Sequence, residues 1–191
     1  MTTGRLALLG VAVTVVLSVS TPAVAAANVE VVLHLDDYAH VPAATLLNVQ
    51  AKVAAIYRAS GIAIGWALGP VAPSTSEVNG IGGTLRHLAV ILVNDGKVTA
   101  CATTPCVLGR AAHEVGRAYV FYDRIVRVTQ TRPVDANVML ARVIAHEVGH
   151  LLLPPGSHSL FGIMQADFDV NSVQPCHFTG DEIALMQSLL R

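Results

Sequence analysis

HEVGHLLLPPGSHSLFGIM, residues 146–164, carries three histidines and one glutamate close together in the chain. The segment that leads into it has apolar residues at spacings of three and four, which predicts an α-helix over 133–153. Side chains four residues apart lie on the same face of a helix. The imidazoles of His146 and His150 are therefore expected to converge, and the stretch predicts a metal site on the longest helix of the chain.

Two converging imidazoles favour zinc, because this ion is bound by nitrogen ligands in tetrahedral sites. Glu147 is rotated by about 100° from His146 around the helix axis, so its carboxylate is expected beside the ion rather than bound to it. A carboxylate in that position can act as the general base for a metal-bound water. A catalytic zinc site needs one further protein ligand and leaves its fourth position to water.

The same helix is expected to be buried, because its other two faces carry small and apolar side chains. Small side chains recur every four residues, at Ala141, Ala145 and Gly149. A second, apolar stripe consists of Leu140, Ile144, Val148 and Leu151. We expect the apolar stripe to face the core and the small residues to let the sheet approach the helix closely.

The stretch 146–164 resembles the active-site segment of the metzincins, zinc metallopeptidases with the motif HExxHxxGxxH followed by a Met-turn. The resemblance implies that His146, His150 and His158 bind one catalytic zinc ion. It also implies that Glu147 is the general base and that Met164 is the Met-turn residue. RAYVFYDR, residues 117–124, is also similar to uncharacterised secreted bacterial members of this group.

The chain departs from the metzincin pattern after the second histidine. His158 comes two residues later than the motif has it, and Leu153 stands in place of the motif's glycine. Pro154 must end the helix, because it lacks the amide hydrogen that would bond to His150. Gly156 can supply the turn, but the sequence leaves open how the chain returns His158 to the other two histidines.

Other residues compete with His158 for the place of third ligand. Glu182 lies on the last expected helix, but a capping box with Thr179 already explains it. Weaker alternatives are Asp167, Asp169 and His177. We therefore expect His158 to be the third ligand.

The four letters HEVG also occur at 113–116. Arg117 follows them at the position where a second imidazole would be needed, and a cation opposes metal binding. A strand is expected directly afterwards, so no long helix sets the spacing of the side chains. We predict no metal role for this copy.

The remaining chain predicts an α/β (α+β) fold with one twisted, mixed sheet. Strands are expected over 28–35, 62–66, 87–93 and 117–122. Helices are expected over 42–60, 133–153 and 179–190, and loops over 69–83, 94–109 and 154–178. A strand, a helix and a further strand in succession favour parallel pairing. The metzincin resemblance implies, in addition, an antiparallel edge strand that binds substrate, which we expect within 94–108.

Residues 1–27 have the three parts of a secretory signal peptide. One basic residue, Arg5, precedes an apolar run, and small residues follow in A-x-A spacing, so cleavage is expected after Ala25 or Ala27. The apolar run is shorter than the roughly 20 residues of a membrane span. We expect a secreted protein, extracellular or periplasmic, without membrane attachment, in which 28–191 form one metzincin-like domain.

The composition indicates a folded protein and gives no sign of a strongly charged binding partner. Hydrophobic residues make up 53% of the chain and charged residues 13%, which is too apolar for a disordered chain. The net charge of −1 gives no reason to expect nucleic acid. The sequence does not indicate an oligomeric state.

The chain has three cysteines, Cys101, Cys106 and Cys176, of which two can pair in an oxidising compartment. The short loop CATTPC favours a disulfide between Cys101 and Cys106. The other two pairings stay open.

Together these features predict a secreted zinc endopeptidase that hydrolyses peptide bonds of a peptide or protein substrate. One alternative is a secreted zinc-containing module that binds peptides without cleaving them, although such a module would have no need of Glu147. Another is a zinc hydrolase of a non-protein substrate.

Overall fold

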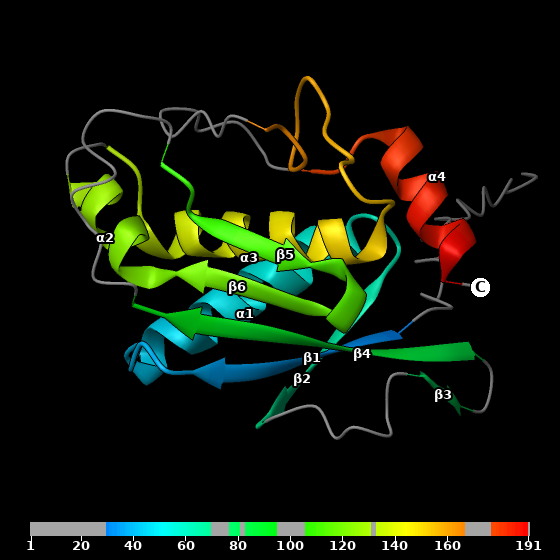
Figure 1. Ribbon diagram of the computed structural model, residues 1–191, viewed down its shortest axis with the longest axis horizontal. Coiled ribbons are helices and arrows are strands. Elements are labelled where there is room, and N and C mark those ends of the chain that lie inside the picture. Colours follow the sequence, from blue (N-terminus) through cyan, green and yellow to red (C-terminus); the bar gives the residue numbers. More distant parts are fainter. Residues whose placement is uncertain are drawn as a thin grey trace, which may run out of the picture.

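The computed structural model describes residues 30–69, 77–80, 83–94, 106–130, 133–166 and 177–190. They form a six-stranded mixed sheet with helices packed on one face, so the predicted α/β class is confirmed (Figure 1). The strands are β1 (Glu30–Asp37), β2 (Ala63–Leu68), β3 (Glu77–Gly80), β4 (Gly83–Val93), β5 (Gly109–Ala112) and β6 (Arg117–Phe121). The helices are α1 (Ala43–Arg58), α2 (Tyr122–Gln130), α3 (Ala136–Leu152) and α4 (Gly180–Leu189).

The sheet runs in the order β2-β1-β4-β6-β5, with β3 paired to β4 outside this path. β1, β2, β4 and β6 are parallel, as the succession of strand, helix and strand predicts. β3 and β5 are antiparallel to their partners. β5 is at one end of the order, so among the described strands only β6 pairs with it and its other side is unpaired.

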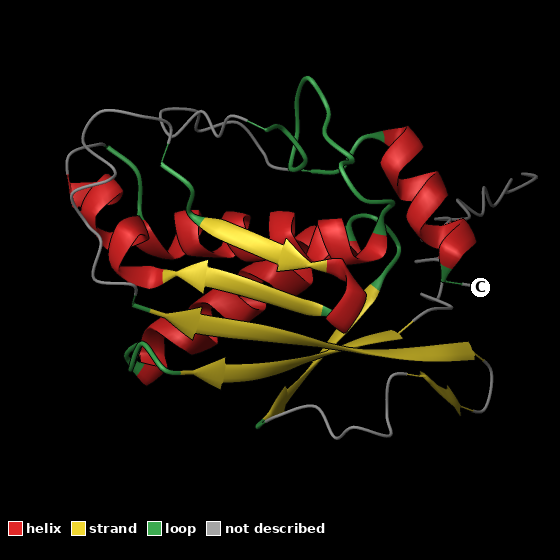
Figure 2. Ribbon diagram, viewed as in Figure 1, coloured by secondary structure: helices red, strands yellow, loops and turns green. Residues whose placement is uncertain are grey.

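The core lies between the sheet and the helices α1 and α3, which Figure 2 shows behind the strands. Alternate side chains of β1, from Val31 to Leu35, are buried, because only one face of the sheet is covered by these helices. α3 is buried on almost all sides, since it packs against α1 as well as against β5 and β6. Among the described helices, none combines the length and the hydropathy that a membrane span requires.

The small-residue stripe of α3 does not face the sheet, and this part of the prediction is wrong. The hydroxyl of Tyr57, on α1, donates a hydrogen bond of 2.8 Å to the carbonyl oxygen of Ala145. A Cβ atom at Gly149 would lie 2.5 Å from the sulfur of Met164 and 3.2 Å from the ring of Phe178. The stripe therefore makes room for α1 and for the chain that follows α3. Helical periodicity predicts that a face is packed, but it does not predict which element packs there.

Two strands differ from the sequence-based prediction. Residues 77–80, expected in a loop, form β3 and pair with the start of β4, which begins at Gly83. The antiparallel edge strand is β5, and it begins just after the expected interval 94–108, of which 95–105 lie outside the described residues. Strands of four residues show little periodicity of their own, and they form because a neighbouring strand offers hydrogen bonds.

The sequence pattern does not predict helix α2 either. Its sequence, YDRIVRVTQ, contains three β-branched apolar residues and a threonine, which favour strands when taken alone. Ile125 is fully buried and Val128 packs against the core. Packing of this apolar side therefore outweighs the local strand preference.

Several expectations concern residues outside the described part of the chain. They are the signal peptide 1–27, the alternative ligands Asp167 and Asp169, and the cysteines Cys101 and Cys176. Cys106 is disulfide-bonded, so one disulfide is present as expected. The choice of Cys101 as its partner stays a prediction.

Tyr57→Phe is expected to lower the free energy of unfolding by about 1 kcal/mol, because it deletes the buried hydrogen bond to Ala145. In a domain of this size the melting temperature should fall by roughly 2–4 °C, measured by circular dichroism. Tyr38→Phe is the matched control, since the Tyr38 side chain is 68% exposed. Equal melting temperatures of Tyr57→Phe and the unmodified protein would contradict this assignment.

Candidate metal centre

Helix α3 carries HEVGH in its second half and is fixed at both ends. At its start the carboxylate of Asp135 accepts hydrogen bonds from the amides of Asn137 and Val138, at 2.8 and 3.0 Å. At its end Leu153 leaves the helical conformation before Pro154, as predicted. The helix therefore holds His146 and His150 on one face, one turn apart, beside the segment that follows.

Three histidines come together at this end of α3. His146 and His150 belong to the helix and His158 to the following loop, and one ring nitrogen of each lies within 4.8 Å of the other two. The Nε2 atoms of His146 and His150 are 3.0 Å apart. Two nitrogens bound to one zinc ion lie about 3.3 Å apart in a tetrahedral site, so small movements would suffice to hold the ion.

A turn directly after the helix brings His158 back. The amide and the hydroxyl of Ser157 both donate to the carbonyl oxygen of Pro154, at 3.2 and 2.7 Å. Gly156 has a φ of +77°, and proline followed by glycine at the two central positions is typical of a type II turn. The sequence PPGS thus reverses the chain and accounts for the two additional residues before His158.

The orientation of His146 is fixed from the side opposite the cluster. Its Nδ1 donates to the carbonyl oxygen of Ile163 at 2.8 Å, which leaves Nε2 to face the other histidines. Ile163 is itself held, because its amide donates to the carbonyl oxygen of His177 at 3.0 Å. A Cβ atom at Gly162 would lie 2.6 Å from that same oxygen, and the φ of Gly162 is +89°. Only glycine fits this turn without strain.

Met164 lies beside this turn and is fully buried. Its sulfur packs against Gly149, on the turn of α3 between the two ligand candidates. Its carbonyl oxygen accepts a hydrogen bond of 2.9 Å from the amide of Ser159, which ties it to the residue after His158. Met164 therefore belongs to the apolar support of the cluster, and its role as a Met-turn residue stays a prediction.

Glu147 points from α3 toward the edge strand β5. Its side chain is 6% exposed, and its carboxylate accepts a hydrogen bond from the backbone of Ala111. A Cβ atom at Gly109 would lie 2.6 Å from both Cγ and Oε1 of Glu147. The glycine at the start of β5 thus makes room for this carboxylate.

The ionisation of Glu147 suits proton transfer near neutral pH. Burial raises the pKa of its carboxyl group to about 7, while the hydrogen bond from Ala111 acts in the opposite direction. A general base is most effective when its pKa lies near the working pH. A divalent cation bound nearby would lower this pKa again, because it favours the carboxylate.

Burial also lowers the pKa of both helical histidines. It lowers the pKa of His146, and together with the neighbouring His146 and His158 it lowers the pKa of His150 to about 4. The neutral imidazole is the form that binds metals. Both rings are therefore neutral and ready for a metal at physiological pH.

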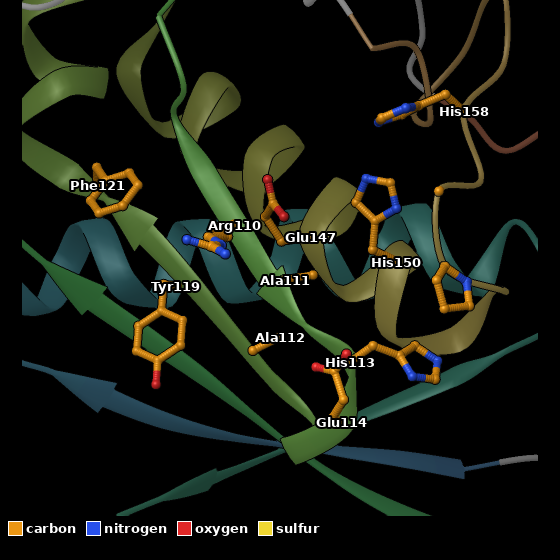
Figure 3. Close-up of a pocket in the computed structure, with 12 residues that line it drawn as sticks. Arg110, Ala111, Ala112, His113, Glu114, Tyr119, Phe121, Glu147, His150 and His158 are labelled. Carbon is orange, nitrogen blue, oxygen red and sulfur yellow. The ribbon is translucent and has the colours of Figure 1, made fainter.

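The cluster opens into a cleft of about 710 Å³ that runs across β5. Figure 3 shows Glu147, His150 and His158 on one side of it and Arg110, Tyr119 and Phe121 on the other.

The outer edge of β5 lies in the same cleft. The carbonyl oxygen of Leu108 accepts from the amide of Phe121 at 2.9 Å, toward β6. Because backbone groups alternate along a strand, Gly109 and Ala111 direct theirs to the outer edge, where Glu147 lies.

Two of the competing residues lie outside the cluster. Glu182 forms the predicted capping box, with its carboxylate 2.7 Å from the amide of Thr179. His177 is exposed, and only its backbone contacts the site, through Ile163. Over the described residues, no other three His, Cys, Asp or Glu side chains bring their ligand atoms this close together.

The first HEVG forms a turn between two strands. Residues His113–Val115 make a short 3₁₀ helix, and Gly116, with a φ of +60°, completes the connection from β5 to β6. It therefore has the same four residue types as 146–149 but not their α-helical conformation. The turn nevertheless matters to the site, because it aligns β5 beside Glu147.

Two supports of the site were missed in the sequence, namely the Ile163 carbonyl that orients His146 and the glycine that faces Glu147. A glycine at position 109 is visible in the sequence, but the reason for it is a side chain on another element. A single sequence contains no signal that joins the two.

No model of a known protein family matches the chain, and no curated protein matches it. Among solved structures, a zinc-dependent peptidase from Methanocorpusculum labreanum (strain Z) is similar with a TM-score of 0.49 and 15% identity, over 82% of this chain and 99% of that one. Archaemetzincin from Methanopyrus kandleri is similar with a TM-score of 0.45 and 15% identity, over 85% of this chain and 96% of that one.

Proposed function

We propose that this chain is a secreted zinc-dependent endopeptidase that binds one zinc ion through His146, His150 and His158. The observation that carries the proposal is the convergence of three imidazole nitrogens within 4.8 Å of one another, in a cleft that also holds a buried carboxylate. Glu147 is next to one of these ligands in sequence and faces the same cleft. Three ligands and one carboxylate are the parts that zinc-dependent hydrolysis requires.

The donor set fits zinc. Neutral imidazoles are good zinc ligands, and the hydrogen bond from His146 to the Ile163 carbonyl is the kind of outer contact that orients such ligands. His158 is exposed, which leaves the cluster open to substrate. A bound zinc ion would polarise the substrate carbonyl and lower the pKa of water.

Glu147 moves the proton in the proposed reaction. Its carboxylate faces the same cleft as the proposed ligands and accepts a proton from the water that attacks the carbonyl carbon of the peptide bond. The same group then delivers that proton to the leaving amine. The Ala111 amide and the space left by Gly109 hold the carboxylate at the edge of the cleft.

The outer edge of β5 is the proposed binding site for an extended peptide. The amide and carbonyl of Gly109 and the carbonyl of Ala111 point away from β6 into the cleft, and an added strand can pair with them. The amide of Ala111 is already bonded to Glu147. This arrangement supports a peptide or protein as substrate rather than a small molecule. Secretion rests on the signal-peptide pattern of 1–27, with 28–191 as the mature domain.

His158→Ala is expected to weaken zinc binding by more than about 100-fold, beyond the 10–100-fold that follows loss of an outer contact. Affinity would be measured by competition with a chromophoric chelator, and zinc content by mass spectrometry. His177→Ala is the matched control, because its imidazole is exposed and lies outside the cluster. Full affinity in His158→Ala, or a loss confined to His177→Ala, would remove His158 from the site.

Glu147→Gln is expected to retain zinc and to lose about 10²- to 10⁴-fold in kcat/KM on peptides, because it removes the proton acceptor. Cleavage of a peptide library, followed by mass spectrometry, provides the readout. Asp181→Asn, an exposed carboxylate at the start of α4, is the control. If Glu147→Gln held zinc and cleaved peptides at the unmodified rate, the proposed role of Glu147 would be wrong. A zinc-loaded protein that binds peptides but never cleaves them would instead support the non-catalytic alternative.

Gly109→Ala is expected to lower kcat by at least about tenfold while zinc content and folding are kept. The new methyl group would lie 2.6 Å from the carboxylate arm of Glu147, and a displacement of about 1 Å can cost 10²-fold in rate. Gly180→Ala is the control, because a Cβ atom there meets nothing within 4 Å. Equal kcat values of Gly109→Ala and Gly180→Ala would show that β5 does not set the position of Glu147.

A further inference from the structure

The cleft has an uneven distribution of charge. Among its described lining residues, Arg110 alone has a permanent positive charge, while Glu114 and Glu147 are acidic. Arg110 is exposed, and within the described part of the chain it forms no hydrogen bond or ion pair. Its guanidinium group is therefore available to a ligand that enters the cleft.

The side of β5 to which Arg110 points follows from its neighbours. Ala111 packs against the core, and the Cβ direction of Gly109 leads to Glu147. Because side chains alternate along a strand, Arg110 lies on the opposite face. There it is directly across from Tyr119 in the pairing with β6.

A second arginine near the cleft differs from Arg110 in its contacts. The guanidinium of Arg124 lies over the ring of Phe121, 4.3 Å from its centroid. It also donates a hydrogen bond of 2.6 Å to the carbonyl oxygen of Val107. Arg124 is thus held by the protein itself, whereas Arg110 is presented to the cleft.

A peptide that pairs with the outer edge of β5 would bring one of its side chains beside Arg110. Opposite residues on paired strands contact each other on the same face of the sheet. Arg110 also lies between Gly109 and Ala111, the two residues that approach Glu147. The peptide residue beside Arg110 is therefore within about two residues of the bond that is cleaved, since successive residues of a strand advance by about 3.3 Å.

We propose that Arg110 determines specificity and selects peptides with aspartate or glutamate at the residue beside it. This inference rests on the proposed peptidase function and adds a substrate class to it. The planar guanidinium binds a carboxylate through two parallel hydrogen bonds, and Tyr119 lies directly opposite Arg110 on β6. Glu147 lies on the other face of β5, at its outer edge. A substrate carboxylate beside Arg110 would therefore be separated from the Glu147 carboxylate by the strand.

The test uses peptides that carry Glu, Gln or Lys in turn at each of the three residues on either side of the cleaved bond. For the unmodified enzyme, kcat/KM is expected to favour Glu over Gln by about two- to fivefold at one position, as for an opposite-charge pair across strands. Arg110→Gln should abolish this preference, and Arg110→Glu should turn it toward Lys. Arg117→Gln is the matched control, because Arg117 is exposed on β6, loses the same charge and does not line the cleft.

Equal kcat/KM for Glu, Gln and Lys at every position would overturn the role of Arg110 while the peptidase function stands. A preference that Arg117→Gln removes as fully as Arg110→Gln would also overturn it, since net charge would then be the cause. If no peptide is cleaved, the peptidase function fails. The role of Arg110 is then tested by labelling the same peptides with a fluorophore and measuring their affinities for the zinc-loaded protein. Tighter binding of Glu peptides that is lost in Arg110→Gln supports the selection, and equal binding of Glu and Lys peptides overturns it.

Discussion

The hydrogen bond from Nδ1 of His146 to the carbonyl oxygen of Ile163, 2.8 Å long, is the contact on which the rest of the site depends. It joins a buried helix to the segment that returns after it, and it directs the free nitrogen of His146 toward the other histidines. The buried side chain of Met164 and the absence of a side chain at Gly149 allow that segment to lie against the helix. Without this close approach His158 would have no fixed position relative to α3.

The position of Glu147, the proposed base, depends on a different contact, between α3 and the edge strand. Glu147 is buried against β5, receives a hydrogen bond from Ala111 and occupies the space that a side chain at position 109 would fill. The same strand exposes its outer edge to the cleft. The strand that holds the carboxylate is therefore also the one proposed to pair with a peptide, so the proposed base and the proposed substrate site share one element.

The sequence alone predicts the parts of the site that are local. The spacing of His146, Glu147 and His150 follows from helical geometry, and the capping box at Thr179 is found as predicted. The assignment of His158 as third ligand depends on the resemblance to metzincins, because no rule of local structure connects this residue to the helix. The short strands β3 and β5, helix α2 and the packing of Gly149 were mispredicted, since each depends on a partner far away in the chain. Local patterns carry no information on such partners.

X-ray absorption spectroscopy at the zinc edge of the zinc-loaded protein tests the central claim, that three histidines hold one zinc ion, most directly. We predict one zinc ion per chain, bound by three imidazole nitrogens and one oxygen at about 2.0–2.1 Å. Scattering from sulfur at about 2.3 Å, or from fewer than three imidazoles, would contradict the site described here.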